Sequence, residues 1–372
     1  MIPLSLYVHF PWCVRKCPYC DFNSHEARGG IPQADYLAAL IRDLDLARPD
    51  AQGRPLTSIF IGGGTPSLMA PATLTRLIDA IRARLTLADD AEITFEANPG
   101  AIEADKFAAF RAAGVTRLSL GIQSFDDGHL AAIGRIHDGD EARRAAALAL
   151  DHFPQVNFDL MYALPGQTPE QARRDIETAV AFGPGHISAY HLTVEPNTAF
   201  HRNPPALPDD DLAADMQDLV ETMLAEAGYQ HYETSAFSRP GRQCRHNLNY
   251  WTFGDYLGIG AGAHAKITHA DGIVREMRRK HPTDYLHAAD FVQERRTVAV
   301  GELPGEFMMN ALRLCVGFAP PLFEQRTGLP LATIEATLRR AQADGLLETS
   351  AQRIAPTLLG RHHLNALIMR FI

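Results

Sequence analysis

The first 200 residues of this chain alternate short apolar runs with amphipathic stretches, and this alternation limits the fold more than any other feature. Apolar runs of strand length begin at Leu4, Ser58, Glu92, Arg117, Val156 and Ile187. Helical patterns lie between them, at Gln33–Arg48, Pro71–Leu85, Glu103–Ala113, Gly139–His152 and Pro169–Phe182. Strands that alternate with helices in this way form right-handed βαβ crossovers, so the pattern predicts an α/β fold with a parallel sheet.

The number of strand–helix units distinguishes between related folds. Six units are present in residues 1–200, whereas a closed TIM barrel needs eight. The count therefore favours an open, partial (βα)6 TIM-like barrel over 1–200, and a doubly wound sheet is the alternative.

The character of the sequence changes after residue 200. A linker rich in proline precedes an expected helix at Asp209–Ala227, an expected strand at Tyr229–Ala236 and the segment Cys244–Trp251. Residues 201–300 are therefore expected to form an α/β extension of the barrel. The last part, 301–372, contains three helical patterns and two short strands around a polar turn, which predicts a winged-helix-like domain after the C-terminal α+β region. The three helices are expected at Glu306–Cys315, Pro320–Gly328 and Leu331–Asp344.

Composition and the N-terminus exclude several classes of protein. Hydrophobic residues make up 46% and charged residues 21%, which is ordinary for a soluble globular protein and excludes a disordered chain. The formal net charge of −9 argues against a dedicated nucleic-acid binder. Met1–Phe10 lacks the basic region and cleavage site of a signal peptide, and no run of 18 apolar residues exists. A soluble cytoplasmic protein is expected.

A group of cysteines follows the first expected strand. Cys13, Cys17 and Cys20 fall within eight residues in a CxxxCxxC pattern. Three thiolates suit one face of a 4Fe–4S cluster, and because clusters that only transfer electrons normally have four cysteines, the fourth iron is expected to accept another ligand. The alternative is a zinc ion with His9 or His25 as fourth ligand, although structural zinc sites prefer CxxC pairs.

Polar residues stand at the ends of nearly all the expected strands. The run Gly62–Pro66 follows the second strand, and Glu96, Gln123, Asp159 and His191 lie at or near the ends of the next four. Each residue alone is explained as well by a hydrogen bond that satisfies a strand end. Because ligands bind at the carboxyl ends of parallel strands, the set predicts a ligand site at one rim. The glycines let the backbone approach a ligand closely and offer N–H groups to an anion.

These motifs resemble those of the radical S-adenosylmethionine superfamily, in which CxxxCxxC has an aromatic residue before the last cysteine and GGGTP follows. Within it, the chain is similar to the oxygen-independent coproporphyrinogen III oxidase family over most of residues 4–200. The matching segments are LYVHFPWCVRKCPYCDFNSH, FIGGGTPS, FEANPG, LSLGIQSF and DLMYALPGQT.

The resemblance implies a set of cofactors and contacts. It implies that the three cysteines hold a 4Fe–4S cluster and that the amino and carboxylate groups of S-adenosyl-L-methionine (SAM) chelate the open iron. The implied contacts of this SAM are Tyr7, Tyr19, Gly63, Gly64, Thr65 and Glu96, and those of a second SAM are Gln123, Arg135 and Asp159. Whether a second SAM binds, and whether SAM is cleaved or only bound, stays open.

Two details resemble the haem-chaperone branch of that family. The dehydrogenases of the family carry a further cysteine two residues after the third, where this chain has Phe22, and Cys244–Trp251 contains the HNxxYW motif of the chaperones. This likeness implies haem bound at His246, with Asn247 orienting the ring, although a capped, buried loop explains the same residues. The implied partners are haem and apo-haemoproteins of the respiratory chain, with at most transient contact with membrane proteins. A homodimer is left open.

Two other functions remain as alternatives. One is an oxygen-independent coproporphyrinogen III dehydrogenase that makes protoporphyrinogen IX, so whether the chain is an enzyme stays open. The other is an iron–sulfur-sensing DNA binder, suggested by the winged-helix pattern. Residues 306–372 contain seven Arg and no Lys against five Asp and Glu, which is little positive charge for neutralising phosphates. No nucleic-acid partner is therefore expected.

Overall fold

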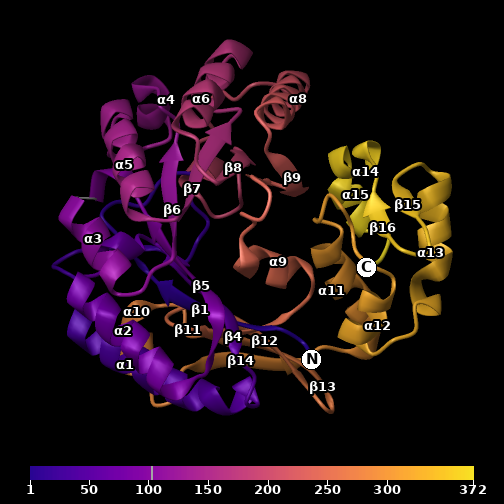
Figure 1. The fold of residues 1–372 in the computed structure, drawn as a ribbon, viewed down its shortest axis with the longest axis horizontal. Coiled ribbons are helices and arrows are strands. Elements are labelled where there is room, and N and C mark those ends of the chain that lie inside the picture. The colour runs from indigo at the N-terminus through magenta and orange to yellow at the C-terminus, as the bar shows by residue number, and fades with distance from the viewer. Residues whose placement is uncertain (102–103) are drawn as a thin grey trace.

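The computed structural model describes residues 1–101 and 104–372. Within these ranges the main feature is a 12-stranded sheet in the order β14-β13-β12-β11-β1-β4-β5-β6-β7-β8-β10-β9. Neighbouring parallel strands form the barrel: β1 (Leu4–Phe10), β4 (Leu56–Gly63), β5 (Leu87–Ala97), β6 (Arg117–Gln123), β7 (Gln155–Tyr162) and β8 (His186–His191). The sheet curves without closing, which confirms the partial (βα)6 barrel (Figure 1).

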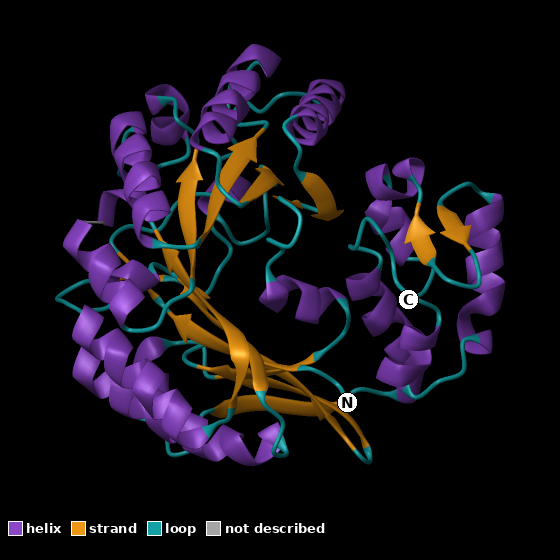
Figure 2. Cartoon of the chain, viewed as in Figure 1, coloured by secondary structure: helices purple, strands orange, loops and turns teal. Residues whose placement is uncertain are grey.

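Helices cover the outer side of this curved sheet (Figure 2). They are α1 (Gln33–Ala47), α2 (Pro71–Arg84), α3 (Ala104–Ala112), α4 (Asp127–Ala132), α5 (Gly139–His152) and α6 (Pro169–Phe182). Capping boxes start α5 and α6, where Asp138 and Thr168 accept hydrogen bonds from backbone N–H groups of the first turn. Glu103, the expected first residue of the third helix, lies outside the described residues.

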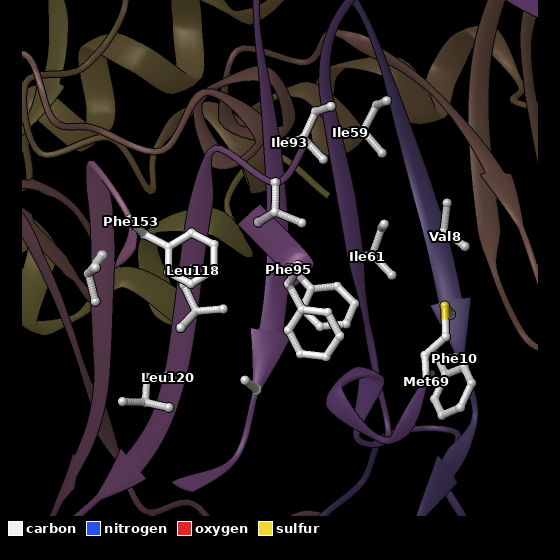
Figure 3. Packing of buried hydrophobic residues seen from close by; sticks show 14 of the residues in the cluster. Val8, Phe10, Ile59, Ile61, Met69, Ile93, Phe95, Leu118, Leu120 and Phe153 are labelled. Carbon is white, nitrogen blue, oxygen red and sulfur yellow. The ribbon is translucent and has the colours of Figure 1, made fainter. Parts of the chain in front are cut away.

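The two faces of the barrel strands differ in chemistry because side chains alternate along a strand. Apolar residues such as Val8, Ile61, Phe95 and Leu120 point to the helix side and pack in the main core (Figure 3). The residues between them face the barrel lumen, and many of those are polar. Buried polar residues at these lumen positions include Ser5, Ser58, Glu92, Thr94, Arg117, Ser119, Asn157, His186 and Ser188. The lumen is therefore a polar environment in which buried groups need partners.

Residues 201–300 add structure to both edges of the sheet. At one edge, α8 (Asp210–Glu226) packs on α6, and β9 (Gln230–Glu233) and β10 (Ala236–Ser238) extend the sheet beyond β8. At the other, β11 (Asp255–Ile259) pairs in parallel with β1, and β12 (His264–His269), β13 (Gly272–Arg278) and β14 (Val292–Thr297) follow as an antiparallel meander. Helix α9 (Arg245–Trp251) lies on the inner side of the sheet, against β4.

One strand expectation differs from the structure. The sequence predicts a single strand over Tyr229–Ala236, but the chain turns at Thr234 and forms the antiparallel pair of β9 and β10. The backbone N–H of Thr234 donates to the Arg313 carbonyl at 3.0 Å, which takes this residue out of the sheet ladder. A contact so distant in sequence is invisible to a local pattern.

The C-terminal residues have their own apolar cluster, which includes Phe307, Phe323 and Leu338. The elements there are α11 (Leu303–Ala311), α12 (Pro321–Thr327), α13 (Ala332–Ala343), β15 (Leu347–Thr349), β16 (Ile354–Pro356), α14 (Leu358–His362) and α15 (Leu364–Ile368). Three helices followed by a β-hairpin match the predicted winged-helix-like arrangement. The divisions at residues 200 and 300 stay predictions.

Small elements complete the described chain. The strands β2 (Trp12–Cys13) and β3 (His25–Glu26) pair beside the cysteine loop, and α7 (Ala199–Arg202) and α10 (Pro282–Leu286) are single turns. Short 3₁₀ helices cover Arg48–Ala51, Pro66–Leu68, Pro99–Ala101 and Val300–Glu302. Among the residues described, no helix combines the length and apolar character needed to span a membrane.

Candidate cofactor site

The three motif cysteines meet at a cavity of about 390 Å³ at the carboxyl ends of the barrel strands. Cys13 ends β2, and Cys17 and Cys20 follow in the loop before β3. All three are free thiols on the cavity wall. Burial raises the pKa of the Cys13 and Cys20 thiols above their usual range, so a positively charged group is needed to hold them as thiolates.

The donor set fits a cluster better than a single ion. In the described chain, no three His, Cys, Asp or Glu side chains converge closely enough to hold one metal ion. His9, one candidate for a fourth zinc ligand, already uses both ring nitrogens: Nδ1 lies 2.9 Å from the Tyr7 hydroxyl and Nε2 lies 2.8 Å from the Asn23 carbonyl. Three free thiols around an open cavity suit a larger group that bridges them, such as the 4Fe–4S cluster.

The glycine run after β4 brings the backbone close to the cysteine loop. A Cβ atom on Gly64 would lie 2.5 Å from the Trp12 carbonyl oxygen and 3.0 Å from Cys13 Sγ, so a larger residue does not fit there. Gly63 has a φ of +122°, a conformation that other residues rarely adopt. These positions therefore require glycine for steric and conformational reasons.

The N–H groups of this run are not free for an anion, contrary to the expectation from the sequence. Gly63 N donates to Glu96 Oε2 at 3.0 Å, and Gly64 N and Thr65 N each donate at 2.7 Å to the carbonyls of Phe10 and Trp12. The run fixes the cysteine loop and a carboxylate, and leaves space for a ligand. The run therefore contributes to binding by letting a ligand come close to the backbone, and it does not offer free N–H groups to an anion.

Two carboxyl groups, Glu96 and Asp159, lie in the lumen below the cysteines. Burial and the nearby Asp159 raise the pKa of Glu96 to about 8, although the Gly63 N–H opposes the shift. Burial also raises the pKa of Asp159, against hydrogen bonds from Ser119 (2.7 Å) and Asn157 (2.8 Å). A ligand with positive charge would favour the ionised form of both groups.

Two further predicted residues line the same cavity. Gln123, at the end of β6, has a φ of 68°, which is unusual for a residue other than glycine and marks strain at a strand end. Arg135 donates through Nη2 to Asn98 Oδ1 at 2.7 Å and to the Gly121 carbonyl at 2.8 Å. Asn98, which the sequence reasoning missed, also donates to Thr65 Oγ1 at 3.1 Å. It stands just after β5, so the rule of polar residues beyond strand ends was its available signal.

The structure gathers most of the predicted site residues and separates two of them. The cavity is lined by Cys13, Cys17, Cys20, Tyr19, Gly63, Gly64, Thr65, Glu96, Gln123, Arg135 and Asp159, and also by Asn98, Met161 and Tyr190, which were not predicted. Tyr7 and His246 are not part of this lining. They form a second group deeper in the lumen, where their ring centroids lie 6.3 Å apart.

His246, on α9, is 4% exposed and packs among aromatic rings. Its ring centroid lies 5.0 Å from that of Phe60 and 5.1 Å from that of Tyr250, and Nδ1 lies 3.2 Å from Ser58 Oγ. Burial lowers the pKa of His246 to about 3, so the imidazole is neutral and able to bind a metal. Ser58 provides the ring contact predicted for Asn247, whose Oδ1 lies 3.4 Å from Cys244 Sγ.

His191, the last predicted rim residue, ends β8 and borders the cavity. Its ring lies 5.5 Å from that of Tyr162, and strand alternation places both side chains on the helix side. The side chain therefore points away from the lumen.

An open (βα)6 barrel with three free thiols, a glycine run and buried carboxyl groups at its carboxyl rim defines a radical SAM-type protein. Residues 7–179 match the Radical SAM superfamily, and residues 301–363 match the HemN C-terminal domain. The solved structure of coproporphyrinogen III oxidase (HemN) from Escherichia coli is similar with a TM-score of 0.84 and 26% identity, over 100% of this chain and 90% of that one.

Relatives of known name show to which family within the radical SAM superfamily the chain belongs. The heme chaperone HemW of Escherichia coli (strain K12) is 48% identical over 372 residues, covering 100% of this chain and 98% of the relative. HemW of Mycobacterium tuberculosis (strain ATCC 25618 / H37Rv) is 38% identical over 98% of this chain and 94% of the relative. The chain belongs to the HemW family.

Proposed function

We propose that this protein binds haem and delivers it to apo-haemoproteins such as respiratory enzymes, in the cytoplasm. The observation that carries the proposal is the likeness to HemW over the whole chain, including the segment with His246. Phe22 adds to it, because this side chain is 62% exposed at the cavity mouth where the resembling dehydrogenases have a cysteine.

The cavity residues support a 4Fe–4S cluster with bound SAM. Cys13, Cys17 and Cys20 would hold the cluster, and Glu96 would face the positive end of SAM near the glycine run. When bound and reduced, the cluster supplies one electron for cleavage of the S–C5′ bond of SAM. The remaining cavity residues orient the ligand and exclude water. A second SAM at Gln123, Arg135 and Asp159 stays a proposal, which is supported by the position of all three residues in the same cavity lining.

Haem has two candidate contact regions. Exposed apolar side chains gather at the cavity mouth, where Val14, Phe22, Ile136 and Tyr190 all line the opening. Such a patch suits the flat face of a porphyrin. The other region is His246, whose neutral imidazole is a normal haem ligand. Because that ring is enclosed by Phe60 and Tyr250, iron binding there requires these rings to move.

The test is anaerobic cluster reconstitution followed by parallel assays of haem binding and coproporphyrinogen III turnover. The proposal expects a stoichiometric Soret band, transfer of haem to an apo-haemoprotein and no protoporphyrinogen IX. His246→Ala is expected to weaken haem binding without loss of iron or sulfide, and His363→Ala, at an exposed C-terminal position, serves as its matched control. Failure to bind haem in the reconstituted wild type would refute the chaperone function.

The second candidate is the coproporphyrinogen III dehydrogenase, favoured by the structural likeness to HemN at a TM-score of 0.84. It predicts oxidative decarboxylation of two propionates to vinyl groups, with consumption of SAM. Robust formation of protoporphyrinogen IX in the same assay would establish this activity in place of the chaperone function.

A further inference from the structure

The guanidinium of Arg135 is fixed against the cysteine loop. Arg135 lies between α4 and α5, and its Nη1 is 3.6 Å from Cys17 Sγ while Nη2 makes the two bonds to Asn98 and Gly121. Its Nε is fully enclosed and has no hydrogen-bond partner. Among the ion pairs of the described residues, none involves Arg135 and a carboxylate. Burial opposes the positive charge of Arg135, but the neighbouring Tyr19 and Cys17 side chains raise its pKa.

Asn98 holds this guanidinium in place. Its side-chain oxygen accepts from Arg135, and its side-chain nitrogen donates to Thr65 Oγ1. Asn98 thereby joins the glycine run after β4 to the arginine between α4 and α5. The absence of a side chain at Gly121 leaves room for the contact between Asn98 and Arg135. A Cβ at this position would lie 2.8 Å from Asn98 Oδ1 and 3.5 Å from Arg135 Nη2.

We propose that Arg135 tunes the reduction potential of the cluster through an N–H···S hydrogen bond to Cys17, and that Asn98 is the residue that positions it. The inference rests on the proposed 4Fe–4S cluster. Hydrogen bonds to cluster sulfurs and nearby positive charge stabilise the reduced form, which carries one more negative charge. Arginine keeps its charge at all accessible pH values, so the effect does not depend on pH.

This role differs from the contact with a second SAM that the family resemblance implied for Arg135. Nη2 is committed to two oxygen atoms, and Nη1 faces sulfur. The geometry therefore directs the charge of Arg135 toward the cysteine loop, where the cluster would be held.

The test is a redox titration of the reconstituted full chain, followed by the EPR signal of the one-electron-reduced cluster. Arg135→Gln is expected to make reduction about tenfold less favourable, which is a shift of about 59 mV to lower potential for a one-electron couple. Asn98→Ala, which keeps the cation but releases it, is expected to shift the potential in the same direction by less. Arg15→Gln is the control, because Arg15 is an exposed cation at the same cavity that bonds to the Gly134 carbonyl and not to sulfur.

The outcomes separate this inference from the proposed function. A wild-type chain that takes up no cluster refutes the proposed cofactor. A loaded Arg135→Gln chain with the wild-type potential overturns the role of Arg135. If Arg135→Gln does not take up the cluster, the Asn98→Ala variant becomes the test. A reduction potential in Asn98→Ala equal to that of the wild type then overturns the proposal. In deuterated buffer, pulsed EPR is expected to detect an exchangeable proton near the cluster that Arg135→Gln removes.

Discussion

Two sets of buried charged side chains, one around Asp255 at the start of β11 and one at the cavity on the carboxyl rim, differ in how their charges are satisfied. Asp255 bonds to Arg54 at 2.6 Å and to Lys266 at 2.9 Å, and all three side chains are buried. At the cavity, Arg135 has an enclosed nitrogen without a partner, and Glu96 has a pKa of about 8. The Asp255 network satisfies its charges within the protein, whereas Arg135 at the cavity keeps a buried nitrogen without a partner.

This difference separates stability from ligand binding. Buried charge is costly unless it is paired, so the network around Asp255 links β11 and β12 to Arg54, just before β4. The same cost at the cavity is offset when a ligand arrives, which is a common property of functional sites. Substitutions in the Asp255 network should therefore change the free energy of unfolding, and those at the cavity should change cofactor binding.

The largest effect is expected from the cysteines. Replacing Cys13, Cys17 and Cys20 together by Ala should abolish iron and sulfide incorporation, because no other thiol lines the cavity in the part of the chain that the structure describes. Iron and sulfide analysis after anaerobic reconstitution measures this. Cys315→Ala, outside the cavity, should keep full incorporation. Stoichiometric zinc without a cluster in the wild type would contradict the prediction.

In the Asp255 network, the largest effect is expected from Asp255 itself. Asp255→Ala leaves Arg54 and Lys266 buried without their carboxylate, so the free energy of unfolding should fall by about 3–5 kcal/mol. Urea unfolding of the cluster-free protein measures it. The control is Asp45→Ala, which removes a partly exposed pair with Arg84 and should cost less than about 1 kcal/mol. Similar losses in both variants would remove the contrast between the two sets of buried charges.

The sequence predicts those features of the barrel and of the candidate site that depend on local patterns. The barrel strands are recognisable because apolar residues such as Ile61 and Phe95 alternate with lumen residues, and the cysteine loop is recognisable from its spacing. The carboxyl rim follows from strand order, since polar residues after parallel strands must meet at one edge. The residues gathered at the cavity were therefore largely predictable.

Partners distant in sequence were not predictable. His246 meets Ser58 across 188 residues, and Arg135 reaches Cys17 across 118. No local pattern states which polar side chain will satisfy another inside the lumen. Asn98 shows the limit well, because its position after β5 suggests a rim residue, whereas its bonds to Thr65 and Arg135 depend on the packing of three strands.

A smaller change in the free energy of unfolding should distinguish the buried His246 from the exposed His191. His246→Ala removes a buried ring and its contact with Ser58, and should lower the free energy of unfolding by about 2 kcal/mol. His191→Ala, at an exposed position on the helix side of the carboxyl rim, should stay within about 0.5 kcal/mol of the wild type. Chemical denaturation of the cluster-free variants measures both. Equal costs would mean that His246 is not part of the stabilising packing.

The smallest effect is a pH dependence at Glu96. Because its pKa is raised from 4.5 to about 8, the folded protein holds a proton that the unfolded chain releases, and the free energy of unfolding should fall as the pH rises through this window. The positive charge of SAM favours the ionised carboxylate, so SAM affinity should rise about tenfold between pH 7 and pH 9, as the ionised fraction increases. Titration of the reconstituted protein with SAM at several pH values measures this rise in affinity.

Glu96→Gln should flatten this pH dependence of SAM affinity, whereas Asp21→Asn, at an exposed carboxyl of the same cavity, should preserve it. An equal rise in the Glu96→Gln variant would assign the titration to another group and place Glu96 among the residues that only shape the cavity.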